Sequence, residues 1–228
     1  MIINEIIYAI REKLKSYTDD TRYTDDYLLY LINLKRSTFL RREYNRPNVT
    51  FDEQILQTIC LEMELVDSSE CPECFINNRC DILRTVKKLP ELIDLHSRSV
   101  ITRVAPIGVT SQPMSIVGRR KFQYVGEDVY QKNTIYGMLH DNKHFYFKSA
   151  NKFIRTFEWV SFTVLAENPM ELSEYSCDSG GTVCYNPDLD KYPVKGHIAD
   201  VIIATIVEEL AGLKQIPEDV INNAKDDI

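Results

Sequence analysis

The hydrophobic residues of this chain change their spacing near Ser68, and this change most restricts the folds that the chain can form. Before Ser68 they recur every three or four residues, which is typical of amphipathic helices. After the polar segment 68–80 they alternate with polar residues, which is typical of half-buried strands. The sequence therefore predicts a helical part followed by a β part.

Two helices are predicted at the start of the helical part. Residues 2–17 carry an apolar stripe, formed by Ile3, Ile7, Ile10, Leu14 and Tyr17. In residues 24–46, Thr24 is suited to capping the first turn, and Asp25 and Asp26 place negative charge where free N–H groups favour it. The predicted buried face of this second helix, which ends before Pro47, consists of Leu28, Leu31, Ile32 and Phe39, widened by Tyr27 and Leu34.

A third helix is predicted over residues 50–66. Thr50 and Glu53 have the spacing of a capping box, in which each side chain accepts a hydrogen bond from the other residue's backbone. The apolar face of this helix would be Ile55, Ile59, Met63 and Val66. Three helices joined by short loops predict an antiparallel bundle.

The β part is predicted to contain four or five strands, at 81–88, 100–104, 134–140, 143–149 and 153–165. Asp141 and Asn142 tolerate positive φ, so they predict a hairpin between the third and fourth of these strands. Residues 170–195 have no regular pattern. A last helix, at 197–210, would stop at Gly212 and pack against the N-terminal helices.

The predicted fold class is therefore α+β, an N-terminal antiparallel helical bundle completed by a C-terminal helix, with an inserted small antiparallel β-domain. The bundle would consist of residues 1–67 plus 196–212, and the β-domain of residues 81–169. A cysteine-bearing loop (68–80) and an irregular connection (170–195) would join them. Residues 213–228 would form a flexible C-terminal tail, which we expect to become ordered on a partner.

The composition excludes several classes of function. The net charge of −7 argues against a protein that wraps DNA or binds a membrane surface, since both need clustered Lys and Arg. The chain has only eight glycines and no phosphate-binding glycine motif. The basic residues of the second helix are interpreted as a solvated face or a partner contact: Lys35, Arg36, Arg41, Arg42 and Arg46.

Only the cysteines have a spacing that suggests chemistry. Cys71, Cys74 and Cys80 could bind zinc, with Cys177 or Cys184 as a fourth ligand. They could also form a disulfide or remain free thiols, and the single C-x-x-C pair does not decide between these alternatives. We therefore predict no metal site and no cofactor.

Catalytic patterns are not found in the sequence. His140 and His144 flank the predicted hairpin, but no carboxylate fork accompanies them, and His96 and His197 are isolated. No G-x-S-x-G motif is present, and the Asp pairs at 19–20 and 25–26 are interpreted as solvated helix-start residues. We predict that the protein is not an enzyme.

The order of these segments resembles a family of phage proteins. The second helix, with Asp25, Asp26, Leu28, Leu31, Ile32, Asn33, Lys35 and Arg36, is similar to the start of podovirus head-to-tail connector proteins. The continuation resembles structural proteins of crAss-like podoviruses that infect Bacteroides. The matching residues there are Ile82, Arg84, Lys87, Lys88 and Pro90, then the segment 102–107 and the ending 223–227.

The resemblance implies a non-enzymatic virion protein in the neck between capsid and tail, assembled in the host cytoplasm. Such proteins form a ring, typically of twelve copies, beneath the portal, extend the DNA channel and carry the tail proteins. The implied partners are further copies of the chain, the portal, other neck and tail rings, and passing double-stranded DNA. The alternative from the cysteines is a cytoplasmic zinc-bearing regulatory or nucleic-acid-binding module.

Overall fold

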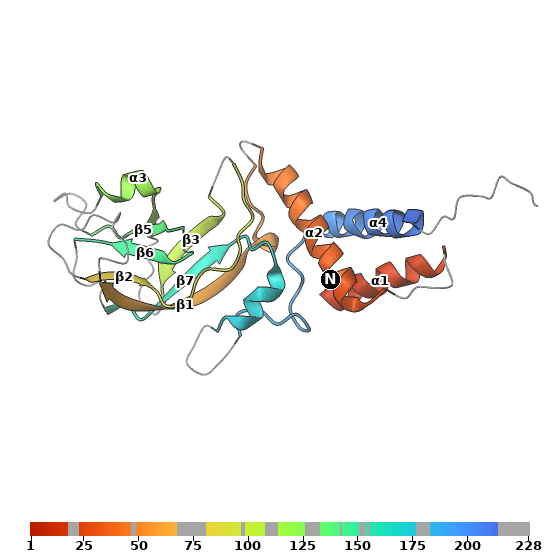
Figure 1. The fold of residues 1–228 in the computed structure, drawn as a ribbon, viewed down its shortest axis with the longest axis horizontal. Coiled ribbons are helices and arrows are strands. Elements are labelled where there is room, and N and C mark those ends of the chain that lie inside the picture. The colour runs from red at the N-terminus through yellow and green to blue at the C-terminus, as the bar shows by residue number, and fades with distance from the viewer. Residues whose placement is uncertain are drawn as a thin grey trace, which may run out of the picture.

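A β-sheet and a group of helices lie toward opposite ends of an elongated molecule (Figure 1). The computed structural model describes residues 1–17, 23–46, 49–67, 81–96, 99–107, 114–125, 133–141, 143–150, 154, 156–176 and 183–213. Helix α2 runs between the two ends, so it contacts both the helices and the segments that leave the sheet.

Three helices form the helical end: α1 (Ile3–Lys15), α2 (Asp25–Tyr44) and α4 (Gly196–Leu213). Helices α1 and α4 lie side by side, with α2 packed across them (Figure 1). The predicted stripe of α1 is buried as expected, except that Tyr17 is exposed. The predicted cap of α2 is confirmed, since Thr24 Oγ1 accepts a hydrogen bond of 3.3 Å from the Tyr27 N–H.

Seven strands form the sheet: β1 (Gln57–Asp67), β2 (Asp81–Thr85), β3 (Ile101–Pro106), β4 (Ser115–Ile116), β5 (Tyr136–Leu139), β6 (Phe145–Lys148) and β7 (Trp159–Val164). Their order is β3-β7-β1-β2-β6-β5-β4. Strands β4 and β5 run parallel, and the other neighbours are antiparallel, so the sheet is mixed.

Strand β1 lies between two groups of strands and pairs with each group through a different half. Its first half, Gln57–Glu62, pairs with β7, and its second half, Met63–Asp67, pairs with β2. The two groups are therefore staggered along β1 and do not lie directly opposite each other.

Two hydrophobic cores belong to the sheet. The larger contains the aromatic cluster Phe145, Phe147 and Phe162, whose ring centroids lie 5.0 to 6.3 Å apart. The smaller lies under the short helix α3 (Arg119–Phe122), whose Phe122 packs with Tyr146 and Ile82. A further 3₁₀ segment, η6 (Pro169–Glu174), follows β7 and faces α2.

The predicted fold class is wrong. The sheet is not a small inserted antiparallel β-domain, because it has seven strands, a parallel pair and a central strand that comes from residues assigned to the bundle. The N-terminal bundle is correspondingly smaller than predicted, since it has two long helices before the sheet and not three.

The error begins at residues 50–66, where the predicted helix is replaced by β1. Residues four positions apart share one face of a helix and also one face of a strand, so Ile55, Ile59 and Met63 fit both periods. The residues between Ile59 and Met63 distinguish a strand from a helix. Leu61 is buried and Glu62 is exposed, as the alternation of a strand requires. The predicted capping residues precede only one 3₁₀ turn, η1 (Glu53–Ile55), which Asp52 caps by accepting a 2.9 Å hydrogen bond from the Gln54 N–H.

The predicted hairpin is confirmed between β5 and β6. His140 and His144 bracket its loop, because the His140 N–H donates to the His144 carbonyl at 3.0 Å. The Lys143 N–H donates to the His140 carbonyl at 2.9 Å, and Lys143 has φ of 65°. Lys143 thus has a left-handed conformation at the end of this loop, whereas the sequence predicts positive φ at Asp141 and Asn142, and Asn142 lies outside the described residues.

The C-terminal helix is longer than predicted. Helix α4 continues through Gly212 to Leu213, so Gly212 does not stop it. The predicted stripe of α4 is buried in the helical core at Ile198, Ile202, Ile206 and Leu210. Val201, which the sequence also places in this stripe, is 46% exposed, and Ile203 is buried in its stead. Among the described residues, no helix is long and apolar enough to cross a membrane.

Candidate assembly interface

Arg36 of α2 connects the helical end to the segments that follow the sheet. Its side chain is fully buried. Its Nε donates to the Pro193 carbonyl at 2.9 Å, and its Nη1 donates to the Ala166 carbonyl at 2.8 Å and the Glu167 carbonyl at 3.3 Å. Burial lowers the pKa of Arg36, because the charged form loses its hydration. The three carbonyl oxygens replace water as hydrogen-bond acceptors of the guanidinium. Arg36 therefore holds the segment after β7 and the segment before α4 against α2.

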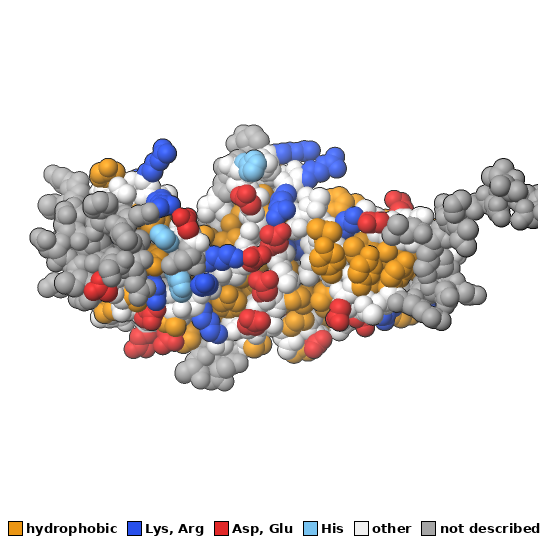
Figure 2. All heavy atoms as spheres, in the orientation of Figure 1, with side chains coloured by type: hydrophobic (Ala, Val, Ile, Leu, Met, Phe, Trp, Pro, Cys, Tyr) orange, Lys and Arg blue, Asp and Glu red, His pale blue; other side chains and the backbone are white. Residues whose placement is uncertain are grey.

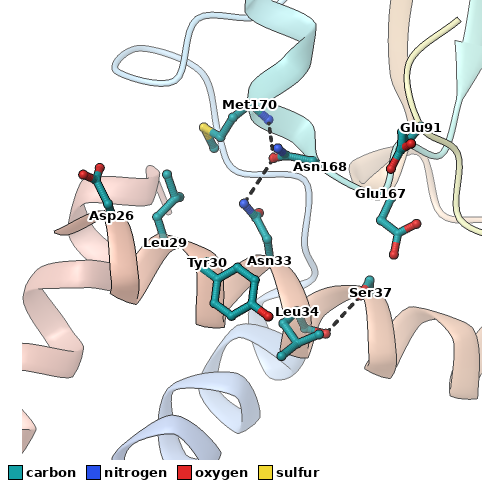
Figure 3. Close-up of a pocket in the computed structure, with 10 residues that line it drawn as sticks. All are labelled: Asp26, Leu29, Tyr30, Asn33, Leu34, Ser37, Glu91, Glu167, Asn168 and Met170. Carbon is teal, nitrogen blue, oxygen red and sulfur yellow. Dashed lines mark hydrogen bonds between the residues drawn. The ribbon is translucent and has the colours of Figure 1, made fainter. Parts of the chain in front are cut away.

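A chain of polar side chains extends this joint. The Tyr192 ring lies 5.7 Å from the Arg36 guanidinium, and its hydroxyl donates to Asn33 Oδ1 at 2.6 Å. Asn33 Nδ2 donates to Asn168 Oδ1 at 3.1 Å, and that same oxygen accepts from the Met170 N–H at 3.1 Å. Burial raises the pKa of Tyr192, so its hydroxyl stays a donor well above neutral pH. The network fixes η6 against α2 (Figure 3).

A pocket of about 400 Å³ opens beside this network, between α2 and η6 (Figure 3). We call it the α2 pocket. Its apolar wall consists of Leu29, Tyr30, Leu34 and Met170. Tyr30 and Leu34 are 60% and 44% exposed, so α2 presents unburied hydrophobic surface here. Figure 2 shows hydrophobic side chains gathered on the helical end of the molecule. Such a patch is typical of a protein–protein contact.

Carboxylates surround the α2 pocket. Asp26, Glu91 and Glu167 line it. Arg41 pairs with Glu167 and Lys143 with Glu91, each at 2.6 Å. Within the described part of the chain, Asp26 has no cation within ion-pair distance, so the rim keeps a negative charge.

A second exposed surface lies on α3, at the sheet end of the molecule and away from α2 (Figure 1). We call it the α3 tip, formed by Arg119, Arg120, Lys121 and Tyr124. Tyr124 is 82% exposed, although its neighbours Phe122 and Val125 are buried in the smaller sheet core. The tip therefore combines an exposed aromatic ring and positive charge on a firmly packed base.

The predicted basic face of α2 is wrong for one residue. Arg36 is buried, whereas Lys35 pairs with Glu209 of α4, and Arg41 pairs with Glu167 after β7. All three of these residues therefore contact distant segments of their own subunit. Arg42 is exposed, as predicted.

The cysteines of the proposed zinc alternative, Cys71, Cys74, Cys80 and Cys177, lie outside the described residues, as do Asp19 and Asp20. Cys60 is buried and Cys184 is partly buried. In the described ranges, no group of three or more His, Cys, Asp or Glu could hold a metal ion. The His140 ring contacts the edge of Tyr146, and His144 Nδ1 lies 2.8 Å from the Thr85 carbonyl, so both rings are part of the hairpin packing.

Sequence reasoning missed three residues of these surfaces. The sequence predicts Arg36 on a solvated face or a partner contact, does not distinguish Tyr30 within its helix, and places Tyr124 outside every predicted element. The only indication for Tyr124 was an aromatic residue next to a basic run, Arg119 to Lys121, in a segment without alternation.

Comparisons with known proteins concern nearly the whole chain. Residues 5–228 match a family model described as phage tail ring protein 2. The chain is also 30% identical to Ring protein 2 of Bacteroides phage crAss001 over 229 residues, which cover 100% of this chain and 98% of that protein. The matched residues include the helices, the sheet, the α2 pocket and the α3 tip.

Proposed function

Because the chain belongs to the phage tail ring protein 2 family of crAss-like phages, and is therefore a structural ring protein of the virion, we propose that its ring sits in the neck. In this position the ring lies beneath the portal, extends the DNA channel and provides the platform to which the tail attaches. The observation that carries the proposal is the family match along residues 5–228.

The charge of the chain supports a channel role. Each subunit has a net charge of −7, and a ring of about twelve copies multiplies that charge around one axis. A negative ring repels the phosphate backbone, so double-stranded DNA passes through without being held.

The subunit architecture also supports a ring. A ring subunit needs two lateral surfaces, and the described residues expose aromatic side chains on two separate elements, such as Tyr30 on α2 and Tyr124 after α3. The buried Arg36 side chain links the helical end to the segments that follow the sheet. Intersubunit contacts made by the helices are therefore held in a fixed position relative to contacts made by the sheet.

The test is to purify the protein with and without the portal protein of its own phage, and to examine both samples by native mass spectrometry and electron microscopy. We expect a closed ring, of about twelve copies, stacked on the portal. Portal alone is the control. Absence of the protein from purified virions, or a failure to assemble on the portal, would overturn the proposed position.

A further inference from the structure

We propose that neighbouring subunits are joined by Tyr124 of one copy inserting into the α2 pocket of the next. This inference rests on the proposed ring, and it assigns the contact that closes it. The occupant of the pocket is a second copy of this chain, and the evidence is the match in shape and charge between two surfaces of the same subunit.

The pocket has the properties of an acceptor. Its volume of about 400 Å³ is enough for one aromatic side chain. The apolar wall that this side chain would contact consists of Leu29, Leu34 and Met170. Asn33 and Asn168 hold the wall in place through their mutual hydrogen bond, so the pocket exists before a partner arrives.

Tyr124 has the properties of an insert. It is 82% exposed, more than any other large hydrophobic residue of the described chain. Its N–H donates to the Lys121 carbonyl at 3.1 Å, and Phe122 and Val125 anchor the turn on either side. A tyrosine that is held on a rigid base loses little entropy on insertion, which is why such residues dominate many interfaces.

The charges around the two surfaces are opposite. Arg120 and Lys121 beside Tyr124 make no ion pair with the described residues, and Asp26 on the pocket rim likewise has none. A contact between the α3 tip and the α2 pocket pairs charges that are unpaired within one subunit. Contacts between two pockets or between two tips are disfavoured, because they bring like charges together.

The positions of the surfaces suit a ring. The tip lies on α3 at the sheet end, whereas the pocket lies on α2, between the sheet and the helices α1 and α4 (Figure 1). A contact between two different surfaces of the same subunit propagates from copy to copy, and it closes into a ring when the rotation between copies allows it.

The test uses two variants that each remove one side of the contact. Tyr124→Ala removes the insert, and Leu34→Arg fills the pocket wall with a cation. Each variant alone should lose the ring, by itself and on the portal, with subunit association weakened by about tenfold or more. An equal mixture should restore one contact, because the Leu34→Arg copy still has Tyr124 and the Tyr124→Ala copy still has a pocket. The mixture should therefore give pairs and no rings in native mass spectrometry.

The matched control is Tyr8→Ala on α1, because Tyr8 is 65% exposed but belongs to neither surface. All variants should keep the wild-type circular dichroism spectrum and melting temperature.

Rings formed by both single variants, or a mixture without pairs, would overturn this contact while leaving the proposed ring intact. If Lys121→Glu keeps the ring but weakens binding of a double-stranded DNA fragment, the α3 tip is a DNA contact and the proposal is wrong. A wild-type protein that forms no ring on its portal would instead contradict the proposed function.

Discussion

The guanidinium of Arg36 donates a 2.8 Å hydrogen bond to the carbonyl of Ala166, although the two residues are 130 positions apart in the chain. A second hydrogen bond, to Pro193, spans 157 positions. One buried side chain thus fixes α2, the end of β7 and the segment before α4 relative to one another.

Arg36→Ala should lower the free energy of unfolding by about 3 kcal/mol or more, because two buried carbonyl oxygens and one partly buried carbonyl oxygen lose this donor and a cavity is left behind. Urea denaturation followed by circular dichroism measures the change. Arg42→Ala, on the exposed side of the same helix, is the control and should stay within about 0.5 kcal/mol of the wild type. Equal effects of the two substitutions would show that Arg36 is not the joint.

Gly137→Ala should destabilise the sheet by about 1–3 kcal/mol, because a Cβ there would lie 2.1 Å from Cε1 of the buried Phe145 ring. Thermal melting measures the loss. Gly118→Ala is the matched control, since a Cβ at Gly118 would meet nothing within 4 Å. A wild-type melting temperature for Gly137→Ala would mean that the ring of Phe145 can move aside at little cost.

Stability should fall as the pH rises above about 10. Burial raises the pKa of Tyr175 and of Tyr185 to about 12, above the ordinary value of 10.0. Between these values the unfolded chain releases tyrosine protons that the folded chain keeps, so alkali favours unfolding, and the stabilisation is fully present below pH 10. Tyr185→Phe should reduce this dependence. Its hydroxyl has no hydrogen-bond partner among the described residues, so the change should cost little at pH 8. Chemical denaturation between pH 8 and 11 measures it, and an unchanged slope would contradict the assignment.

Replacing Cys71, Cys74 and Cys80 by Ser should leave the protein soluble, folded and able to assemble. These residues lie outside the described part of the chain, and the prediction follows from their single C-x-x-C spacing. Metal analysis of the wild type and of the triple variant, each with and without a chelator, gives the readout. Stoichiometric zinc in the wild type that disappears in an insoluble variant would establish the zinc alternative.

Deleting residues 214–228 should leave the far-ultraviolet circular dichroism of the remaining chain intact but weaken its binding to the portal. The sequence of this segment is polar and has no apolar stripe, so we expect it to be ordered by a partner. Portal pull-down and electron microscopy of mutant heads, which should lack tails, test this. A truncated protein that binds portal as tightly as the intact one would rule the segment out.

The parts that the sequence predicts correctly depend on near neighbours. The stripe of α1 and the Thr24 cap are decided within a few residues, as is the hairpin between β5 and β6. The parts that it misses depend on distant segments. Ile59 and Met63 suit either a helix or a strand until β7 and β2 supply backbone partners.

The candidate surfaces were missed for the same reason. Arg36 stands in a basic run that is typical of solvent-exposed helix, and only carbonyl oxygens 130 and more positions away make its burial possible. Tyr30 and Tyr124 are single aromatic residues, and exposure is a property of the folded surface that no local pattern encodes.

The staggered pairing of β1 has a mechanical consequence. The strand group β3–β7 is attached through Gln57–Glu62, and the group β2–β6–β5–β4 through Met63–Asp67, so a pull along β1 that separates the groups passes through this one strand. The backbone hydrogen bonds of β1 lie perpendicular to the strand, so a pull along the strand loads many of them in shear at the same time. The hydrogen bonds therefore do not break one after another. A subunit with this arrangement can bear load across the sheet without losing its strand pairs one at a time.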